Sequence, residues 1–372
     1  MLPRRLSQQP SQQAAEESLQ WPERARRESY PTLRINDVRP RRVSLPTCPA
    51  ILSAALPEKS ECYPGQVKTT RRSKLVVVLP IAMLAVGACF LFAPVRLAGL
   101  VLIGHSPQCT FARAVESVDH KRRLEETKDR IFKASRLLET DSTGMRLWQT
   151  PRGAFWIPPG EDWGLPFNLS EQENRIYGTG EQAVHTGDVV LDCGANVGVY
   201  TREALAEGAK LVIAIEPALE NLECLRRNMA AEVAAGRVII YPKGVWDKDD
   251  FLTIRVDPDN PAADSFVLNQ KGSHEGLRLP LTTIDKLVEE LKLERVDYIK
   301  MDIEGAEPRA ITGAAQTLRR FHPRLALSAY HNPSDPATIP VLVRQGWDGY
   351  RMECGPCAYW AGVVRPDVLY FR

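Results

Sequence analysis

The segment from Val189 to Gly198 constrains the fold of this chain more than any other part of the sequence. An apolar strand ends in the acid Asp192, and a loop of small residues then leads toward a predicted helix. Glycines at positions 194 and 198 let such a loop turn tightly and let its backbone approach a ligand closely. The segment therefore predicts a ligand-binding loop at the carboxyl end of a strand.

Strands and helices alternate from residue 188 to the end of the chain. We predict strands over Val189–Asp192, Leu211–Ile215, Val238–Tyr241, Phe251–Val256, Tyr298–Met301, Leu325–Ala329, Tyr350–Met352 and Val368–Phe371. Predicted helices span Val199–Glu207, Leu219–Met229, Thr283–Leu291, Pro308–Leu318 and Pro336–Gln345. This alternation predicts an α/β fold, with a mostly parallel sheet that helices cover on both faces.

A second acid, Glu216, ends the next predicted strand, where a carboxylate can accept hydrogen bonds from ribose hydroxyls. The glycine loop lacks the third glycine of dinucleotide folds, because Asn196 stands there, and it lacks the lysine of a phosphate-binding loop. A nucleoside ligand without phosphates, such as S-adenosylmethionine, fits better, since its sulfonium favours nearby carboxylates. A βα turn without a ligand is the plainer alternative.

A third strand, predicted over Tyr298–Met301, leads to the same sheet edge and is followed by Asp302, Glu304 and Glu307. Ligands of open α/β sheets bind at the carboxyl ends of the strands, which favours a site role for Asp302. Glu307 could instead act only on the dipole of the helix that follows it. Lys300 lies two residues before Asp302, so it points to the same face of the strand and can pair with an acid there.

Four segments, in this order and spacing, resemble the FkbM family of S-adenosylmethionine-dependent methyltransferases: GDVVLDCGANVGVYT, IAIEP, LTTIDKL and YIKMDIEGAE. The resemblance covers roughly residues 147–350. It implies a Rossmann-like class I methyltransferase fold with a seven-stranded sheet, and methylation of a hydroxyl on a sugar, glycan or lipid-linked acceptor. The cofactor-binding residues that it implies are Asp192, Gly194, Asn196, Gly198, Glu216, Asn221, Trp246, Asp247 and Asp302.

Transfer of a methyl group to a hydroxyl benefits from a base that removes the hydroxyl proton. His331 follows the predicted strand Leu325–Ala329 at the same sheet edge, so it is our first candidate base. Asp302 is the rival, and Glu304 completes the predicted catalytic set. We assign no metal, although a divalent cation among these three side chains is a weaker alternative, since oxygen and imidazole ligands suit Mg²⁺ or Mn²⁺.

The N-terminal part of the chain differs sharply in composition. Residues 1–74 are rich in Arg, Gln, Ser and Pro and carry a net charge of +7, which leaves −5 for the remainder of a chain of net charge +2. Low apolar content predicts disorder for this segment. The next 21 residues, Leu75 to Val95, hold no charge, and an apolar stretch continues to about residue 104. We therefore predict one transmembrane helix and a single-pass membrane protein.

The charges that flank this apolar run place the basic head in the cytoplasm, whereas cytosolic synthesis of the cofactor favours a cytoplasmic catalytic domain. The side of the catalytic domain stays open. After the run we predict a helical spacer over residues 106–145, with its helix from Ala112 to Leu138, and a methyltransferase domain over residues 146–372.

The near-neutral net charge gives no sign of a nucleic-acid partner, so we expect a small-molecule, glycan or lipid-linked acceptor and a membrane. Two alternatives are a methyltransferase for protein or nitrogen acceptors and a membrane-tethered binding protein that lacks catalysis. Eight cysteines in so long a chain do not form a disulfide scaffold. The pair Cys354 and Cys357 is either redox-active or two ordinary thiols in a turn.

Overall fold

The computed structural model describes residues 83–84, 87, 92–104, 108–256, 264–268, 273–360 and 363–372. The described residues from 92 onward belong to one compact unit. The basic segment 1–74 and most of the apolar run from Leu75 to Val95 lie outside the described residues.

The prediction of a single-pass membrane protein is wrong, because the described residues contain no helix that could cross a membrane. Helix α3, Ala93–Leu102, has 10 residues, about half of the roughly 20 that a membrane span needs.

A mixed sheet of seven strands forms the centre of the unit, in the order β12-β15-β11-β10-β4-β5-β6. The strands are β4 (Val189–Cys193), β5 (Leu211–Ile215), β6 (Val238–Tyr241), β10 (Tyr298–Met301), β11 (Arg324–Ser328), β12 (Met352–Cys354) and β15 (Val368–Phe371). β11, β10, β4, β5 and β6 run parallel, and β15 is antiparallel to both of its neighbours, β11 and β12. The predicted α/β class and the seven strands are confirmed.

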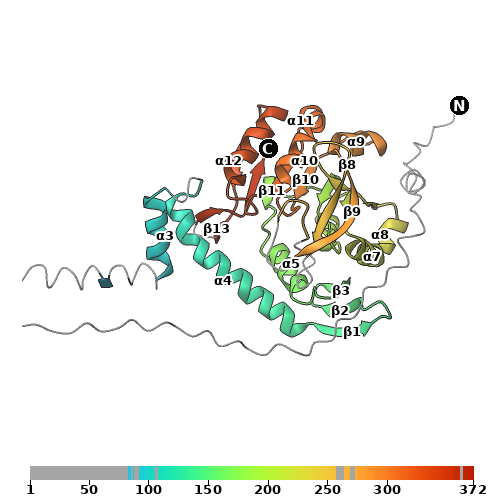
Figure 1. Cartoon of the computed structure of the whole chain (residues 1–372), viewed down its shortest axis with the longest axis horizontal. Helices are drawn as coiled ribbons and strands as arrows, with labels where there is room; N and C mark the ends of the chain where they lie inside the picture. Colours follow the sequence, from blue (N-terminus) through green and yellow to red (C-terminus); the bar gives the residue numbers. More distant parts are fainter. Residues whose placement is uncertain are drawn as a thin grey trace, which may run out of the picture. The chain divides into compact units, whose positions relative to one another are not determined.

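Alternate residues of the central strands enter two different cores, because successive side chains of a strand point to opposite faces. One core contains Leu191 and Ile213 with residues of α9 (Ile284–Glu290), α10 (Glu307–Thr312), α11 (Ala315–Phe321) and α12 (Asp335–Gly346). The other contains Val190 and Val212 with residues of α6 (Val199–Ala206) and α7 (Leu219–Asn228). Helices therefore cover both faces of the sheet (Figure 1).

Among the described residues, three smaller sheets and the two helices α5 (Gly164–Glu173) and α8 (Ala230–Ala234) lie around this centre. The sheets are β1–β2–β3 (Arg136–Thr140, Arg146–Thr150, Gly153–Ile157), β7–β9–β8 (Gly244–Val245, His274–Thr282, Asp250–Val256) and β13–β14 (Cys357–Trp360, Val363–Pro366). A 3₁₀ turn spans Gly180–Gln182. Strand β9 was not predicted, since its charged residues, Gly276 and Pro280 hide the strand pattern.

The predicted spacer helix forms as α4, Phe111–Ala134, and runs along the lower edge of the unit in Figure 1. The side chain of Thr110 caps its first turn, and Leu124 and Ile131 are among its buried residues. The helix ends four residues before the predicted Leu138, because Leu137 pairs with Trp148 in the β1–β2 hairpin. Leu137 and Leu138 are consequently exposed.

A disulfide joins Cys357 to Cys109, which lies 248 residues earlier in the sequence. Cys354 is a free cysteine, and its Sγ lies 3.6 Å from the backbone oxygen of Gln108. Neither interpretation of the Cys354–Cys357 pair is therefore right, because Cys357 is bonded to a distant partner. The bond ties strand β13 to the residues that precede helix α4.

Candidate functional site

The chain places four acidic or glycine-rich loops at one edge of the sheet, where β11, β10, β4 and β5 lie side by side. The loop after β4 carries Gly194 and Asn196, β5 leads to Glu216, and β10 leads to Asp302. His331 follows β11 in the next loop. These are the carboxyl ends of parallel strands, so residues 100 or more apart in the sequence meet at one place.

The loop after β4 needs glycine at position 194 for two reasons. Its φ of +80° lies in the left-handed region, and a Cβ there would lie 1.9 Å from the backbone oxygen of Asp302. The loop is held against β5, because the amides of Gly194 and Ala195 both donate to the carbonyl oxygen of Ile215 at 3.0 Å. The backbone of the loop thus lies directly beside the acid that ends β10.

Glu216 is buried, and backbone amides hold both of its carboxylate oxygens. The amide of Asn196 donates to Oε2 at 2.9 Å, and the amide of Ala218 donates to Oε1 at 2.8 Å. Burial raises the pKa of Glu216 to about 7, against the opposing effect of these hydrogen bonds. A carboxylate has about four lone-pair sites, so Glu216 can accept a further hydrogen bond from a hydroxyl.

A pocket that is partly open to solvent lies at this sheet edge, and the empty space there, open solvent included, is about 580 Å³. It is lined by the glycine loop after β4, by carboxylates and by apolar side chains from β7, β8 and the segment 264–268. The lining residues are Gly194, Asn196, Ile215, Glu216, Pro217, Asn221, Gly244, Val245, Ile254, Asp264, Phe266, Asp302, Ile303, Glu304 and Ala306. A ligand with an apolar ring, hydroxyls and a positive charge would find a partner for each group there.

Six predicted site residues line this pocket: Gly194, Asn196, Glu216, Asn221, Asp302 and Glu304. Four other predicted residues are not among those that line it. Gly198 packs against α7, where a Cβ would lie 2.8 Å from Cδ1 of Leu225. Trp246 packs with Leu281 and Ala306, and Asp247 accepts a hydrogen bond of 2.6 Å from Arg309.

The fourth residue, Asp192, is fully buried and is not among the residues that line the pocket. Its Oδ1 lies 3.3 Å from Nζ of Lys300, and its Oδ2 accepts a hydrogen bond of 2.6 Å from Thr201. Nζ of Lys300 also donates to the carbonyl oxygen of Gly194 at 2.9 Å. Asp192 therefore supports the glycine loop from within the protein, through Lys300, and its predicted contact with the cofactor stays a prediction.

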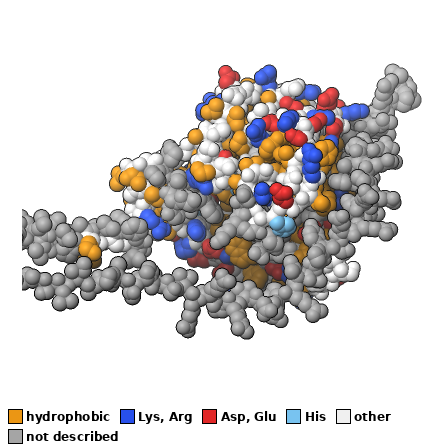
Figure 2. Space-filling view, in the orientation of Figure 1, with side chains coloured by type: hydrophobic (Ala, Val, Ile, Leu, Met, Phe, Trp, Pro, Cys, Tyr) orange, Lys and Arg blue, Asp and Glu red, His pale blue; other side chains and the backbone are white. Residues whose placement is uncertain are grey.

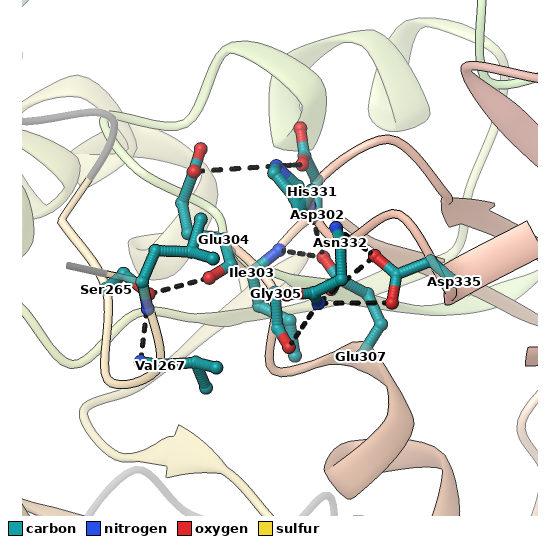
Figure 3. A network of polar contacts seen from close by, with 12 residues as sticks. Ser265, Val267, Asp302, Ile303, Glu304, Gly305, Glu307, His331, Asn332 and Asp335 are labelled. Atoms are coloured by element: carbon teal, nitrogen blue, oxygen red, sulfur yellow. Dashed lines mark hydrogen bonds and ion pairs between the residues drawn. The ribbon is translucent and has the colours of Figure 1, made fainter. Parts of the chain in front are cut away.

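His331 lies at the centre of an acidic cluster beside the pocket (Figure 3). Its Nδ1 is 3.0 Å from Oε1 of Glu307, whose side chain has no exposed surface. Its Nε2 faces Oδ1 of Asp302 at 3.4 Å and Oε2 of Glu304 at 3.5 Å. Burial opposes the charged imidazolium, but Glu307 and Glu304 together raise the pKa of His331 well above its ordinary value.

Two side chains hold the loop that carries Asp302, Glu304 and Glu307, the acidic loop, through its backbone oxygens. Oγ of Ser265 donates to the backbone oxygen of Glu304 at 2.6 Å, and Nδ2 of Asn332 donates to the backbone oxygen of Gly305 at 3.2 Å. Glu304 itself has a φ of +52°, which is rare for a residue with a side chain. The surrounding contacts therefore hold the acidic loop in one conformation.

Several residues at the site carry no signal in the sequence. Tyr177 lies in an irregular segment, yet its hydroxyl donates to Oδ2 of Asp302 at 2.7 Å. Asp264 and Phe266 line the pocket from the connection between β8 and β9. No periodicity or motif marks this connection, so only the tertiary structure identifies these residues.

Comparison with known proteins agrees with the site. Residues 192–348 match the family model of the methyltransferase FkbM domain. No curated protein matches the chain. One similar solved structure is a methyltransferase FkbM from Methylobacillus flagellatus KT, with 18% identity and a TM-score of 0.39; the match covers 70% of this chain and 62% of that one.

A second similar structure is a putative methyltransferase from Streptococcus mutans in complex with SAH, with 12% identity and a TM-score of 0.34 over 54% of this chain and 95% of that one. This chain thus spans less than two thirds of the M. flagellatus protein. The family model thus identifies residues 192–348 of the chain as a methyltransferase FkbM domain.

Proposed function

We propose that this chain is an S-adenosylmethionine-dependent methyltransferase that methylates a hydroxyl oxygen of a sugar, glycan or lipid-linked acceptor. The pocket beside Glu216, the glycine loop and Asp302 carries this proposal. The family match supports methyl transfer, and the acceptor class is the one that the resemblance to the family implies.

Each side of the pocket suits one part of the cofactor. The free lone pairs of Glu216 would accept hydrogen bonds from the ribose hydroxyls, and the loop at Gly194 and Asn196 would hold the methionine part. The carboxylates of Asp302 and Glu304 would lie near the sulfonium. When bound, S-adenosylmethionine supplies an activated methyl group, so the protein chiefly aligns the acceptor and removes its proton.

The carboxylates are better placed than His331 to take that proton. The imidazole of His331 is only 3% exposed and is not among the residues that line the pocket, so its predicted base role stays a prediction. Burial raises the pKa of Glu304, and its side chain keeps 21% of its surface exposed at the pocket. We therefore assign acceptance of the hydroxyl proton to the carboxylate of Glu304.

Calorimetric titration of the full chain with S-adenosylmethionine tests this function. Glu216→Ala is expected to weaken binding about 10- to 100-fold, because hydrogen bonds to a charged group contribute about 1.5–3 kcal/mol. The exposed Glu220, four residues later, provides a control, and Glu220→Ala should bind as the parent does. A folded parent that binds no S-adenosylmethionine would refute the proposal. Transfer of labelled methyl groups to glycan and lipid fractions tests the acceptor class.

The affinity for S-adenosylmethionine should rise with pH through about 7, because Glu216 has a pKa of about 7 and accepts hydrogen bonds best when ionised. Below that pH the carboxyl is protonated and binding must release the proton, so the affinity should fall about tenfold per pH unit. Titrations from pH 5.5 to 8.5 measure this. Glu216→Gln, which cannot ionise, should bind weakly at every pH, and a parent affinity that does not change with pH would contradict the assignment.

A further inference from the structure

The cluster of Asp302, Glu304 and His331 has more negative charge around one point than its own contacts neutralise. One ligand atom from each residue lies within 4.8 Å of the other two. The imidazole of His331 is 3% exposed, and its Nε2 is buried without a hydrogen-bond partner. Oδ1 of Asp302 is also buried without a hydrogen-bond partner. Three ligand atoms therefore converge on a point that needs a positive charge.

Glu307 orients the imidazole toward this point. Its carboxylate is fully buried and lies 3.0 Å from Nδ1, which donates a hydrogen bond to it, so in a neutral ring the lone pair is on Nε2. The lone pair of Nε2 then faces the two carboxylates. A carboxylate that holds the far nitrogen of an imidazole in this way is the usual partner of a metal-binding histidine.

The distances at Nε2 are longer than those of a hydrogen-bonded imidazolium. An imidazolium hydrogen-bonded to a carboxylate places nitrogen and oxygen about 2.7–2.9 Å apart. Nε2 is instead 3.4 Å from Oδ1 of Asp302 and 3.5 Å from Oε2 of Glu304. Ligands that share one cation at about 2.1 Å are separated by about 3.0–3.4 Å, so the observed spacing is closer to that of metal ligands.

We propose that Asp302, Glu304 and His331 form a divalent cation site at the wall of the pocket. Two carboxylate oxygens and one imidazole nitrogen are a ligand set that suits Mn²⁺ or Mg²⁺. The side chains of Asp302 and Glu304 are 18% and 21% exposed, and both line the pocket, which gives the ion a path from solvent. In Figure 3 the carboxylate of Glu304 faces the imidazole of His331 across a dashed line.

Such a cation would also serve methyl transfer, because a divalent ion lowers the pKa of a hydroxyl bound to it. This role rests on the proposed function, whereas the site itself rests only on the cluster. The remaining coordination positions would face the pocket, where the acceptor hydroxyl must lie. The cation would then orient the acceptor and make its proton easier to remove.

Titration of the full chain with Mn²⁺, followed by electron paramagnetic resonance of the free ion, tests the site. We expect one Mn²⁺ per chain, and at least 100-fold weaker binding in both Glu304→Gln and His331→Gln, each of which changes one ligand with little change in size. Glu307→Gln should weaken binding about tenfold, since it perturbs the orientation of the ring. Glu203→Gln is the control, because Glu203 is a partly buried acid paired with Arg152 elsewhere, and its Mn²⁺ affinity should match that of the parent.

Mn²⁺ binding that is absent in the folded parent, or unchanged in Glu304→Gln and His331→Gln, would overturn the site. Circular dichroism confirms that each variant is folded. Calorimetry with S-adenosylmethionine on the same preparations separates this failure from that of the proposed function. A chain that binds S-adenosylmethionine but not Mn²⁺ loses only the cation site, and a chain that binds Mn²⁺ but not S-adenosylmethionine loses only the proposed function.

Discussion

Gly194→Ala is expected to abolish S-adenosylmethionine binding and to lower the free energy of unfolding by about 2–5 kcal/mol. The left-handed φ of +80° costs about 1–2 kcal/mol for a residue with a Cβ. The new Cβ would also lie 1.9 Å from the backbone oxygen of Asp302, and overpacking of this kind costs about 1–3 kcal/mol more. Relief of the contact must separate the glycine loop from Asp302, which form adjacent walls of the pocket.

Gly187→Ala is the matched control for this variant. Gly187 has a φ of +92°, but nothing lies within 4 Å of the Cβ position, so only the backbone term of about 1–2 kcal/mol applies. Urea unfolding and calorimetric titration measure both variants. Gly187→Ala should bind S-adenosylmethionine as the parent does. If Gly194→Ala binds equally well, the close approach of the glycine loop to Asp302 has no role in the pocket.

The sequence predicts the sheet well because the signal for its strands is local. The apolar strands β4, β5, β10 and β11 are separated by helices of ordinary length, and this alternation leaves little choice but a parallel sheet. The carboxyl ends of these strands then have to share one edge. That rule alone brings Gly194, Glu216 and Asp302 together, and the structure places all three around one pocket.

The direction of a side chain at the end of a strand is harder to predict. Asp192 pairs in register with Lys300 of β10, and both side chains point into the protein rather than into the pocket. The acid in the equivalent loop after β5, Glu216, does line the pocket. In the sequence both acids stand at the end of an apolar strand. Only the register of β10 against β4 shows that Asp192 has a structural role, whereas Glu216 lines the pocket.

Contacts between distant segments have no signal in a single sequence. Cys109 and Cys357 are 248 residues apart, and either could have paired with another cysteine. Tyr177 reaches Asp302, 125 residues later in the chain, from an irregular segment. The helix predicted over Pro308–Leu318 breaks into α10 and α11 near Gly313, where a Cβ would lie 2.0 Å from the backbone oxygen of Trp246. Each of these features depends on packing that local patterns do not describe.

Lys300→Met is expected to lower the free energy of unfolding by about 3–5 kcal/mol and to prevent S-adenosylmethionine binding. The side chains of Lys300 and Asp192 are 5% and 0% exposed, and removal of one partner leaves the other charge buried without compensation. Burial opposes the charge of Lys300, but Asp192 and Asp302 together raise its pKa above the ordinary value. The variant also loses the hydrogen bond from Nζ to the carbonyl oxygen of Gly194, which holds the glycine loop.

The destabilisation by Lys300→Met should grow with pH. Burial already raises the pKa of Asp192, and loss of the lysine favours the protonated carboxyl further. Folding of the variant is therefore coupled to uptake of a proton, and this uptake costs more free energy as the pH rises. Urea unfolding at pH 5 and pH 8 measures the difference.

Adding Asp192→Asn removes the second charge, keeps an oxygen acceptor for Thr201 and should restore most of the stability. The exposed pair of Arg122 and Asp119 is the control, since Arg122→Met should leave stability unchanged at both pH values. If the single and double variants are equally unstable, the loss comes from the packing of the lysine stem, and the buried ion pair does not account for it.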